Sequence, residues 1–147
     1  MLRPFVDDFL LRALVLLAVL LLAGAIGLVL RRRSGQTRVV TGGERLDAAE
    51  LAIPLGERAT FVQFSSPACS PCRSVQRVLS DLVVAEPDLG HVEIDATERL
   101  DLARRLGILR TPTVLLLDPQ GVVVRRISGP ITPEQARAAV PEPTRSR

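Results

Sequence analysis

Cys69 and Cys72 are the only cysteines of the 147-residue chain, and two residues separate them. Such a pair can act as a metal clip, a structural staple or a reversible redox couple. A disulfide across so short a loop contributes little to stability, because loop-closure entropy grows with loop length. A structural zinc site needs four ligands, and the chain adds only His91 unless a carboxylate or a second chain takes part. We therefore favour the redox couple and expect His91 to be an incidental residue, at the surface or at a strand edge, and not a ligand.

The residues around the pair predict where the two sulfurs lie. Residues 60–64 have the composition of a short strand, and apolar residues recur at helical spacing over residues 70–85, with Pro71 in the first turn. Unpaired N–H groups and the helix dipole favour a thiolate at such a helix start, which is where Cys69 lies. Cys72, one turn further on, is expected to be more buried. This asymmetry suits Cys69 to attack a substrate disulfide and Cys72 to resolve the mixed disulfide.

Strands and helices alternate through the rest of the soluble part. The pattern predicts a short first strand at 38–41, a helix at 47–51 and a strand at 92–95. A helix follows that is capped by Asp95 and Glu98 and ended by Gly107. The remaining elements are a strand at 113–117, a turn at 118–121, a strand at 122–127 and a helix at 132–140. This order predicts an α/β sandwich with a mixed central sheet that is partly parallel and partly antiparallel.

Two stretches, FVQFSSPACSPCRSVQRVLSDL and LGILRTPTVLLLDPQG, resemble the thioredoxin superfamily. The resemblance implies a thioredoxin-like sandwich in which Cys69 is the nucleophile and Cys72 the resolving thiol of a redox-active disulfide. It also implies that Pro112 is a cis-proline packed against the disulfide and that Thr111 offers backbone groups to a substrate strand. The central proline of Cys-Ser-Pro-Cys is similar to that of the reducing members, so we expect a disulfide reductase. No cofactor or metal is implied, and the expected partners are protein disulfide substrates and an upstream thiol reductant.

Several positions depart from the family pattern. Ala68 stands where the family often has tryptophan, and Gln63 aligns with a buried aspartate that helps to deprotonate the resolving thiol. An amide cannot accept that proton. We predict that Glu93, buried across the strand pair and hydrogen-bonded to Gln63, exchanges a proton with Cys72; alternatively, Glu93 faces solvent and a water does so. Arg73 occupies a position that is commonly basic, where it would stabilise the thiolate or attract acidic partners, or would be merely solvated.

Residues 13–30 contain no charged side chain. Together with the residues just before them they predict a transmembrane helix at 10–30, because about 20 residues rising about 1.5 Å each cross a hydrocarbon layer of about 30 Å. The run is longer than the h-region of a cleaved signal peptide, roughly 7–15 residues, and ends in three arginines instead of a cleavage site. The domains predicted are an N-terminal flank (1–9), a transmembrane helix (10–30), a basic linker (31–45), a thioredoxin-like domain (46–140) and a tail (141–147).

Charge and composition bear on the orientation of the anchor and on the partners of the chain. Arginines are more numerous after the apolar run than before it, so the positive-inside rule predicts a cytoplasmic domain on a single-pass cell-membrane anchor, the alternative being an extracytoplasmic one. All 19 basic residues are arginine, which excludes a P-loop lysine or a lysine Schiff base. The chain has no Trp or Tyr to stack on bases, so we expect no nucleic-acid partner. The predicted function is a membrane-anchored thiol–disulfide oxidoreductase, and the alternative is a membrane-tethered redox-sensing or binding module without turnover.

Overall fold

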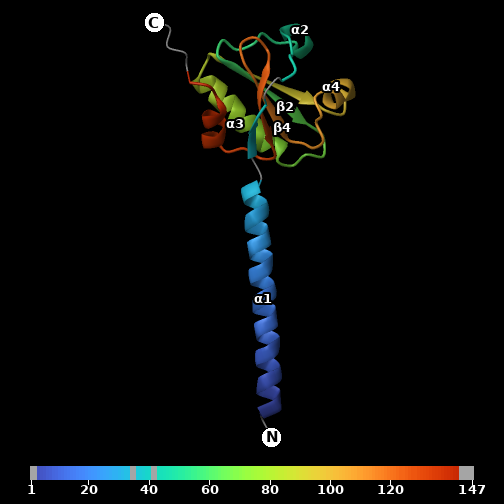
Figure 1. Cartoon of the computed structure of the whole chain (residues 1–147), viewed down its shortest axis with the longest axis vertical. Coiled ribbons are helices and arrows are strands. Elements are labelled where there is room, and N and C mark those ends of the chain that lie inside the picture. The colour runs from blue at the N-terminus through green and yellow to red at the C-terminus, as the bar shows by residue number, and fades with distance from the viewer. Residues whose placement is uncertain (1–2, 34–35, 41–42, 143–147) are drawn as a thin grey trace. The chain divides into compact units, whose positions relative to one another are not determined.

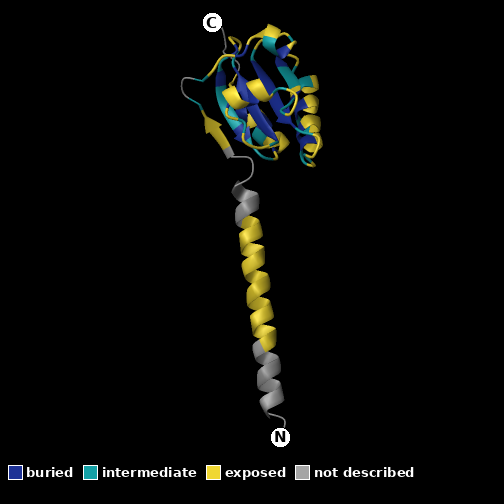
Figure 2. Ribbon diagram, turned by 90° about the vertical axis from the view of Figure 1, so that its right-hand side faces the viewer, coloured by how far each residue is buried: buried dark blue, intermediate teal, exposed yellow. Residues whose placement is uncertain are grey.

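The computed structural model describes residues 3–33, 36–40 and 43–142, and among these the side chains of residues 12–28, 37–40 and 43–142. The chain divides into two compact units, residues 1–33 and 34–147 (Figure 1). The first unit contains helix α1 (Arg3–Arg33), whose apolar side chains from Leu14 to Leu28 are exposed (Figure 2). Among the described residues, no helix has the length and apolar character needed to cross a membrane. The span at residues 10–30 thus stays a prediction.

The second unit is built on a five-stranded mixed sheet, as the order of elements predicted. Its strands are β1 (Gln36–Val39), β2 (Ala59–Ser65), β3 (Leu89–Asp95), β4 (Thr113–Leu117) and β5 (Val123–Ser128), arranged in the order β1-β5-β4-β2-β3. Strand β2 runs parallel to β3 and antiparallel to β4, and the β4–β5 and β5–β1 pairs are antiparallel. Strand β1 lies within the segment that was predicted as a basic linker. It pairs with β5, which is the last strand in the sequence.

Helices cover both faces of this sheet (Figures 1 and 2). One face packs against α3 (Cys72–Ala85) and α5 (Pro133–Ala139), around the buried residues Phe61, Val75, Leu79, Val114, Leu116, Ile127 and Ala136. The other packs against α2 (Ala48–Leu51) and α4 (Leu100–Arg105), around Leu46, Leu51, Val62, Phe64, Leu102, Leu106 and Leu115. All residues of β2 and β4 are buried, because a central strand with helices on both sides has no face in water.

Several boundaries differ from the predicted ones for local reasons. Helix α3 begins at Cys72, so Pro71 is its N-cap residue and not part of its first turn. The prediction of a capping box at Asp95 and Glu98 is wrong. The Asp95 carboxylate instead accepts hydrogen bonds from the backbone N–H and the hydroxyl of Thr97. Because of this short turn, α4 begins only at Leu100. Its end was predicted correctly: Gly107 has a positive φ of 60°, a conformation that favours glycine. Of the predicted tail, residues 143–147 lie outside the described part of the chain.

Candidate functional site

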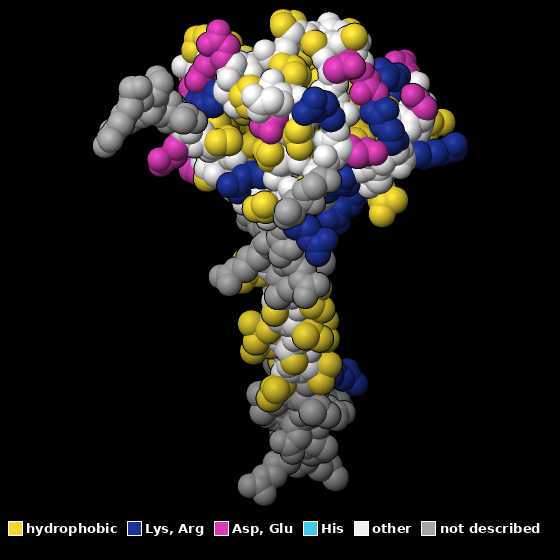
Figure 3. Space-filling model, turned by 45° about the horizontal axis from the view of Figure 1, so that its top comes forward, with side chains coloured by type: hydrophobic (Ala, Val, Ile, Leu, Met, Phe, Trp, Pro, Cys, Tyr) yellow, Lys and Arg dark blue, Asp and Glu magenta, His cyan; other side chains and the backbone are white. Residues whose placement is uncertain are grey.

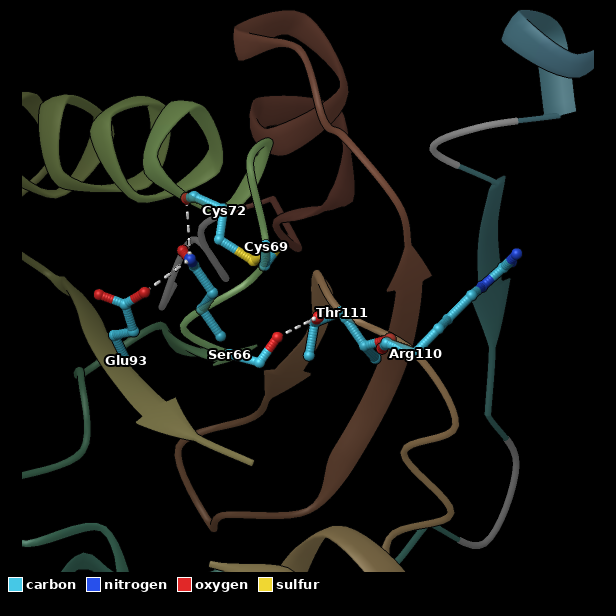
Figure 4. The surroundings of a disulfide bond; sticks show 8 residues. Ser66, Cys69, Cys72, Glu93, Arg110 and Thr111 are labelled. Carbon is cyan, nitrogen blue, oxygen red and sulfur yellow. Dashed lines mark hydrogen bonds between the residues drawn. A yellow bond between two sulfur atoms is a disulfide. The ribbon is translucent and has the colours of Figure 1, made fainter. Parts of the chain in front are cut away.

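The two cysteines form a disulfide at the junction between β2 and α3 (Figure 4). Their Cα atoms lie 5.5 Å apart. Cys69 is partly exposed in the turn that precedes the helix, whereas Cys72 is the first residue of α3 and only 3% exposed. The turn is held by hydrogen bonds from the Cys69 N–H to the Ser66 carbonyl and from the Cys72 N–H to the Cys69 carbonyl. The first sulfur is thus the one that an outside molecule can reach.

Beneath the disulfide lies Gln63, a fully buried side chain on β2. Its Nε2 donates hydrogen bonds to the Cys72 carbonyl at 3.0 Å and to Oε1 of Glu93 at 3.2 Å. The parallel pairing of β2 and β3 places Gln63 directly opposite Glu93, which explains this contact. The hydrogen bond predicted between the two residues is therefore present. The predicted burial of Glu93 is wrong, because its side chain is exposed at the side of the sheet.

The loop before β4 approaches the disulfide from the other side. Its Thr111–Pro112 peptide bond is cis, which is the geometry that the family resemblance implies. The hydroxyls of Thr111 and Ser66 are hydrogen-bonded to each other at 3.0 Å, and the Pro112 carbonyl accepts a hydrogen bond from the Gly129 N–H. Sequence reasoning missed Ser66, because nothing local in the sequence indicates a partner 45 positions away. These contacts fix the loop beside the turn that carries Cys69.

An open depression of about 480 Å³ borders the disulfide on the β3 side. Both cysteines contribute to its lining, and its charged residues are Arg73, Glu93, Asp95 and Glu98. Hydrogen bonds from the Thr97 hydroxyl and then from the Thr97 backbone N–H lower the pKa of Asp95, so its carboxylate keeps its charge in more acidic solution than an ordinary aspartate. Arg73 is exposed and adds one positive charge beside the sulfurs. The predicted residues Cys69, Cys72, Gln63, Glu93 and Arg73 are therefore close together, and sequence reasoning missed the two further acids.

His91 does not line this depression, although it lies two positions before Glu93 on the same face of β3, the face that α3 covers. Its Nδ1 is 3.5 Å from the Ser80 hydroxyl, and burial lowers its pKa. It therefore contributes no charge to the site at neutral pH.

The family model described as a thioredoxin-like domain matches residues 46–142. NADPH-dependent thioredoxin reductase 3 of Arabidopsis thaliana is 36% identical over 73 residues, which are 49% of this chain and 14% of that protein. The SPbeta prophage-derived thioredoxin-like protein YosR of Bacillus subtilis is 28% identical over 69 residues, 47% of this chain and 80% of YosR. The chain thus spans only a small part of the plant reductase.

Solved structures of similar proteins agree with the family match. The oxidised form of mitochondrial thioredoxin 3 from Saccharomyces cerevisiae has a TM-score of 0.51 and 26% sequence identity, covering 57% of this chain and 77% of that chain. The residues that the family model matches include strands β2 to β5 and both cysteines.

Replacing Gln63 tests the energetic cost of its buried amide. Oε1 of Gln63 has no hydrogen-bond partner among the described residues, and an unpaired buried acceptor is unfavourable. Once the amide is removed, Glu93 can bond to water because it is exposed. The Cys72 carbonyl loses one hydrogen bond, but as the first residue of α3 it remains the acceptor of the helical bond from four residues on. We expect Gln63→Met, which nearly preserves volume, to raise the free energy of unfolding of the oxidised protein by about 1 kcal/mol in urea titrations.

The matched control is Thr60→Val on the same strand. Its hydroxyl accepts a hydrogen bond from the Gly56 N–H at 2.8 Å, so its loss should lower the free energy of unfolding by about 1–3 kcal/mol. A comparable loss for Gln63→Met would show that the amide stabilises the fold after all.

Proposed function

Because the chain belongs to the family of thioredoxin-like domains, we propose that it is a membrane-anchored thiol–disulfide oxidoreductase that reduces protein disulfides. The observation that carries this proposal is the Cys69–Cys72 disulfide at a strand–helix junction, with its first cysteine accessible and its second buried. The Cys-Ser-Pro-Cys sequence supports the reducing direction through its resemblance to the reducing members of the family.

The reaction that we propose begins with the reduced pair. The Cys69 thiolate attacks one sulfur of a substrate disulfide, forms a mixed disulfide and releases the other substrate sulfur as a thiolate. Cys72 then loses its proton and attacks the Sγ atom of Cys69, which releases the second substrate thiolate and forms the Cys69–Cys72 disulfide. Two electrons thereby pass to the substrate, and an upstream thiol reductant restores the pair. The helix dipole of α3 favours the thiolate at its N-terminus.

Glu93 is our candidate for the group that takes the proton from Cys72. It lines the same depression as Cys72 and accepts a hydrogen bond from Gln63. Gln63 acts as a positioning residue, because its amide cannot take up the proton but contacts both the carboxylate and the Cys72 carbonyl. Since Glu93 is exposed, water can carry the proton between the thiol and the carboxylate.

The loop before β4 is our candidate for the substrate-binding edge. Among the described residues, no hydrogen bond uses the backbone N–H or carbonyl of Thr111, so both groups can pair with an extended substrate. Pro112 holds the loop beside the disulfide without offering a competing N–H donor. Arg73, exposed beside the sulfurs, would stabilise thiolates that form during exchange.

The membrane anchor is proposed from the sequence of residues 13–30, which has no charged side chain. A helix of this length spans about 27 Å, close to the hydrocarbon thickness of a bilayer. The arginines that follow it support a cytoplasmic domain, because basic residues are retained on that side.

Turnover of a disulfide substrate tests the catalytic proposal. With a thiol reductant in excess, the full chain should reduce insulin repeatedly, as measured by precipitation of the released B chain. Cys69→Ser should abolish this activity, and Cys72→Ser should accumulate mixed disulfides because the resolving thiol is gone. Partner binding that changes with oxidation state, without repeated reduction, would instead indicate a redox sensor.

The Glu93 assignment predicts a slower resolution step. Glu93→Gln should slow the closure of the Cys69–Cys72 disulfide by about tenfold at neutral pH, a modest value for general acid–base catalysis from an exposed group. This rate is measured by following the decay of a mixed disulfide in a stopped-flow instrument. The difference in rate between variant and wild type should diminish at higher pH, because hydroxide then takes the proton from Cys72 in place of the carboxylate. Glu98→Gln removes another acid of the same depression that does not contact Gln63, and is the matched control. Equal rates and pH profiles for Glu93→Gln and the wild type would exclude this role.

The orientation of the proposed anchor can be tested with a membrane-impermeant thiol reagent after mild reduction. In intact cells Cys69 should stay unlabelled, and permeabilisation should expose it. Replacing Arg31, Arg32 and Arg33 by serine removes the charges next to the span and should increase labelling in intact cells. Labelling of the wild type without permeabilisation would place the domain outside, and recovery of the chain without membranes would contradict the anchor.

A further inference from the structure

A second depression, of about 430 Å³, lies beyond the cis-proline loop. Its five lining residues are Thr37, Arg38, Arg110, Arg126 and Ser128, so that it contains three arginines and no acid. On the face of the globular unit drawn in Figure 3, basic and acidic side chains are interspersed in the upper part, whereas basic ones gather along the lower edge. We call the depression lined by these five residues the arginine hollow.

The register of the sheet creates this concentration of charge. Arg38 on β1 lies directly opposite Arg126 on β5, and like charges in facing positions of a sheet repel each other. The described salt bridges include neither of them, nor Arg110. A bound anion would relieve this repulsion, which solvent alone reduces only in part.

Arg126 is held in place by the end of α4. Its Nη1 donates a hydrogen bond to the Gly107 carbonyl at 3.0 Å, and its Nη2 donates to the Leu106 carbonyl. A guanidinium group has five N–H donors, so donors remain for a ligand after these two bonds. Arg38 and Arg110 are exposed and face the same hollow. One fixed and two adjustable guanidinium groups suit carboxylates, which arginine binds in bidentate fashion.

The arginine hollow adjoins the disulfide through a short chain of contacts. Arg110 precedes Thr111, whose hydroxyl is hydrogen-bonded to Ser66 in the turn that carries Cys69. Figure 4 shows the Arg110 side chain extending away from the disulfide, on the side opposite Glu93. The Arg110 carbonyl accepts a hydrogen bond from the Thr113 hydroxyl, which fixes the backbone at this point. A protein segment paired with Thr111 would therefore extend over the hollow.

We propose that the arginine hollow binds an acidic segment of the protein substrate, next to the cysteine that Cys69 attacks. The inference rests on the proposed function, since the substrate is the disulfide-bearing protein. The depression on the β3 side contains three acids and one arginine, so an acidic segment is directed to one side of the disulfide only. The charge of a protein segment thus determines whether it binds as substrate and in which direction it crosses the site.

Binding without redox chemistry tests this inference. Two fluorescein-labelled peptides are compared, identical except for Glu or Gln at the positions flanking a central serine. The oxidised full chain should bind the Glu peptide more tightly by about fivefold in fluorescence anisotropy, the size expected of two or three exposed ion pairs. The preference should shrink as salt rises from about 0.05 M to about 0.5 M, because the Debye length falls.

Arg38→Ser combined with Arg110→Ser should abolish this preference, and both positions are exposed, so the fold should tolerate the change. The matched control combines Arg77→Ser and Arg104→Ser, which remove the same charge from exposed helix positions outside both depressions. Equal binding of the two peptides by the wild type, or an equal loss in the control, would overturn the inference. Inorganic phosphate that binds as tightly as the Glu peptide would overturn it too, by identifying a phosphate site.

Reduction of matching disulfide peptides separates the two proposals. If the Glu peptide is bound preferentially but no peptide is reduced, the proposed function fails and the acidic-segment site stands. If both peptides are reduced at equal kcat/KM and bound equally, the oxidoreductase stands and the arginine hollow has no part in substrate choice.

Discussion

The site depends on strand β2, which is buried along its whole length and paired on both sides. Its parallel pairing with β3 sets Gln63 level with Glu93, and its antiparallel pairing with β4 sets Phe64 level with Thr113. The second pairing brings the cis-proline loop to the end of β2, where the chain turns into α3. The disulfide, the Glu93 carboxylate and the cis-proline loop thus owe their proximity to one strand.

Gln63 illustrates how this buried strand limits the chemistry at its end. A charged carboxylate at a fully buried position would lose several kcal/mol of hydration unless it were well paired. The neutral amide avoids that cost while still contacting the Cys72 carbonyl and Glu93. Negative charge is instead carried by Glu93, whose side chain is exposed. The amide thereby links the buried end of α3 to a group that can exchange protons with water.

Charge around the disulfide is arranged asymmetrically. The depression on the β3 side contains Glu93, Asp95 and Glu98 with Arg73, and the arginine hollow beyond Thr111 contains no acid in its lining. The Ser66–Thr111 hydrogen bond lies between the two, close to Cys69. In the reaction that we propose, a substrate segment crossing this point would meet opposite charge on its two sides, and electrostatics would orient it before the sulfurs meet.

The sequence by itself determined the features that depend on nearby residues. Apolar periodicity placed the helix that follows Cys69, and Gly107 marked the end of α4, because backbone conformation depends on neighbouring side chains. The mixed sheet followed from the order of strands and helices. Only the tertiary structure decided that Glu93 is exposed, that Asp95 closes a turn instead of capping a helix, and that Arg38 faces Arg126. These outcomes depend on which distant segments pack together, and the pairing of β1 with β5 joins residues about ninety positions apart in the sequence.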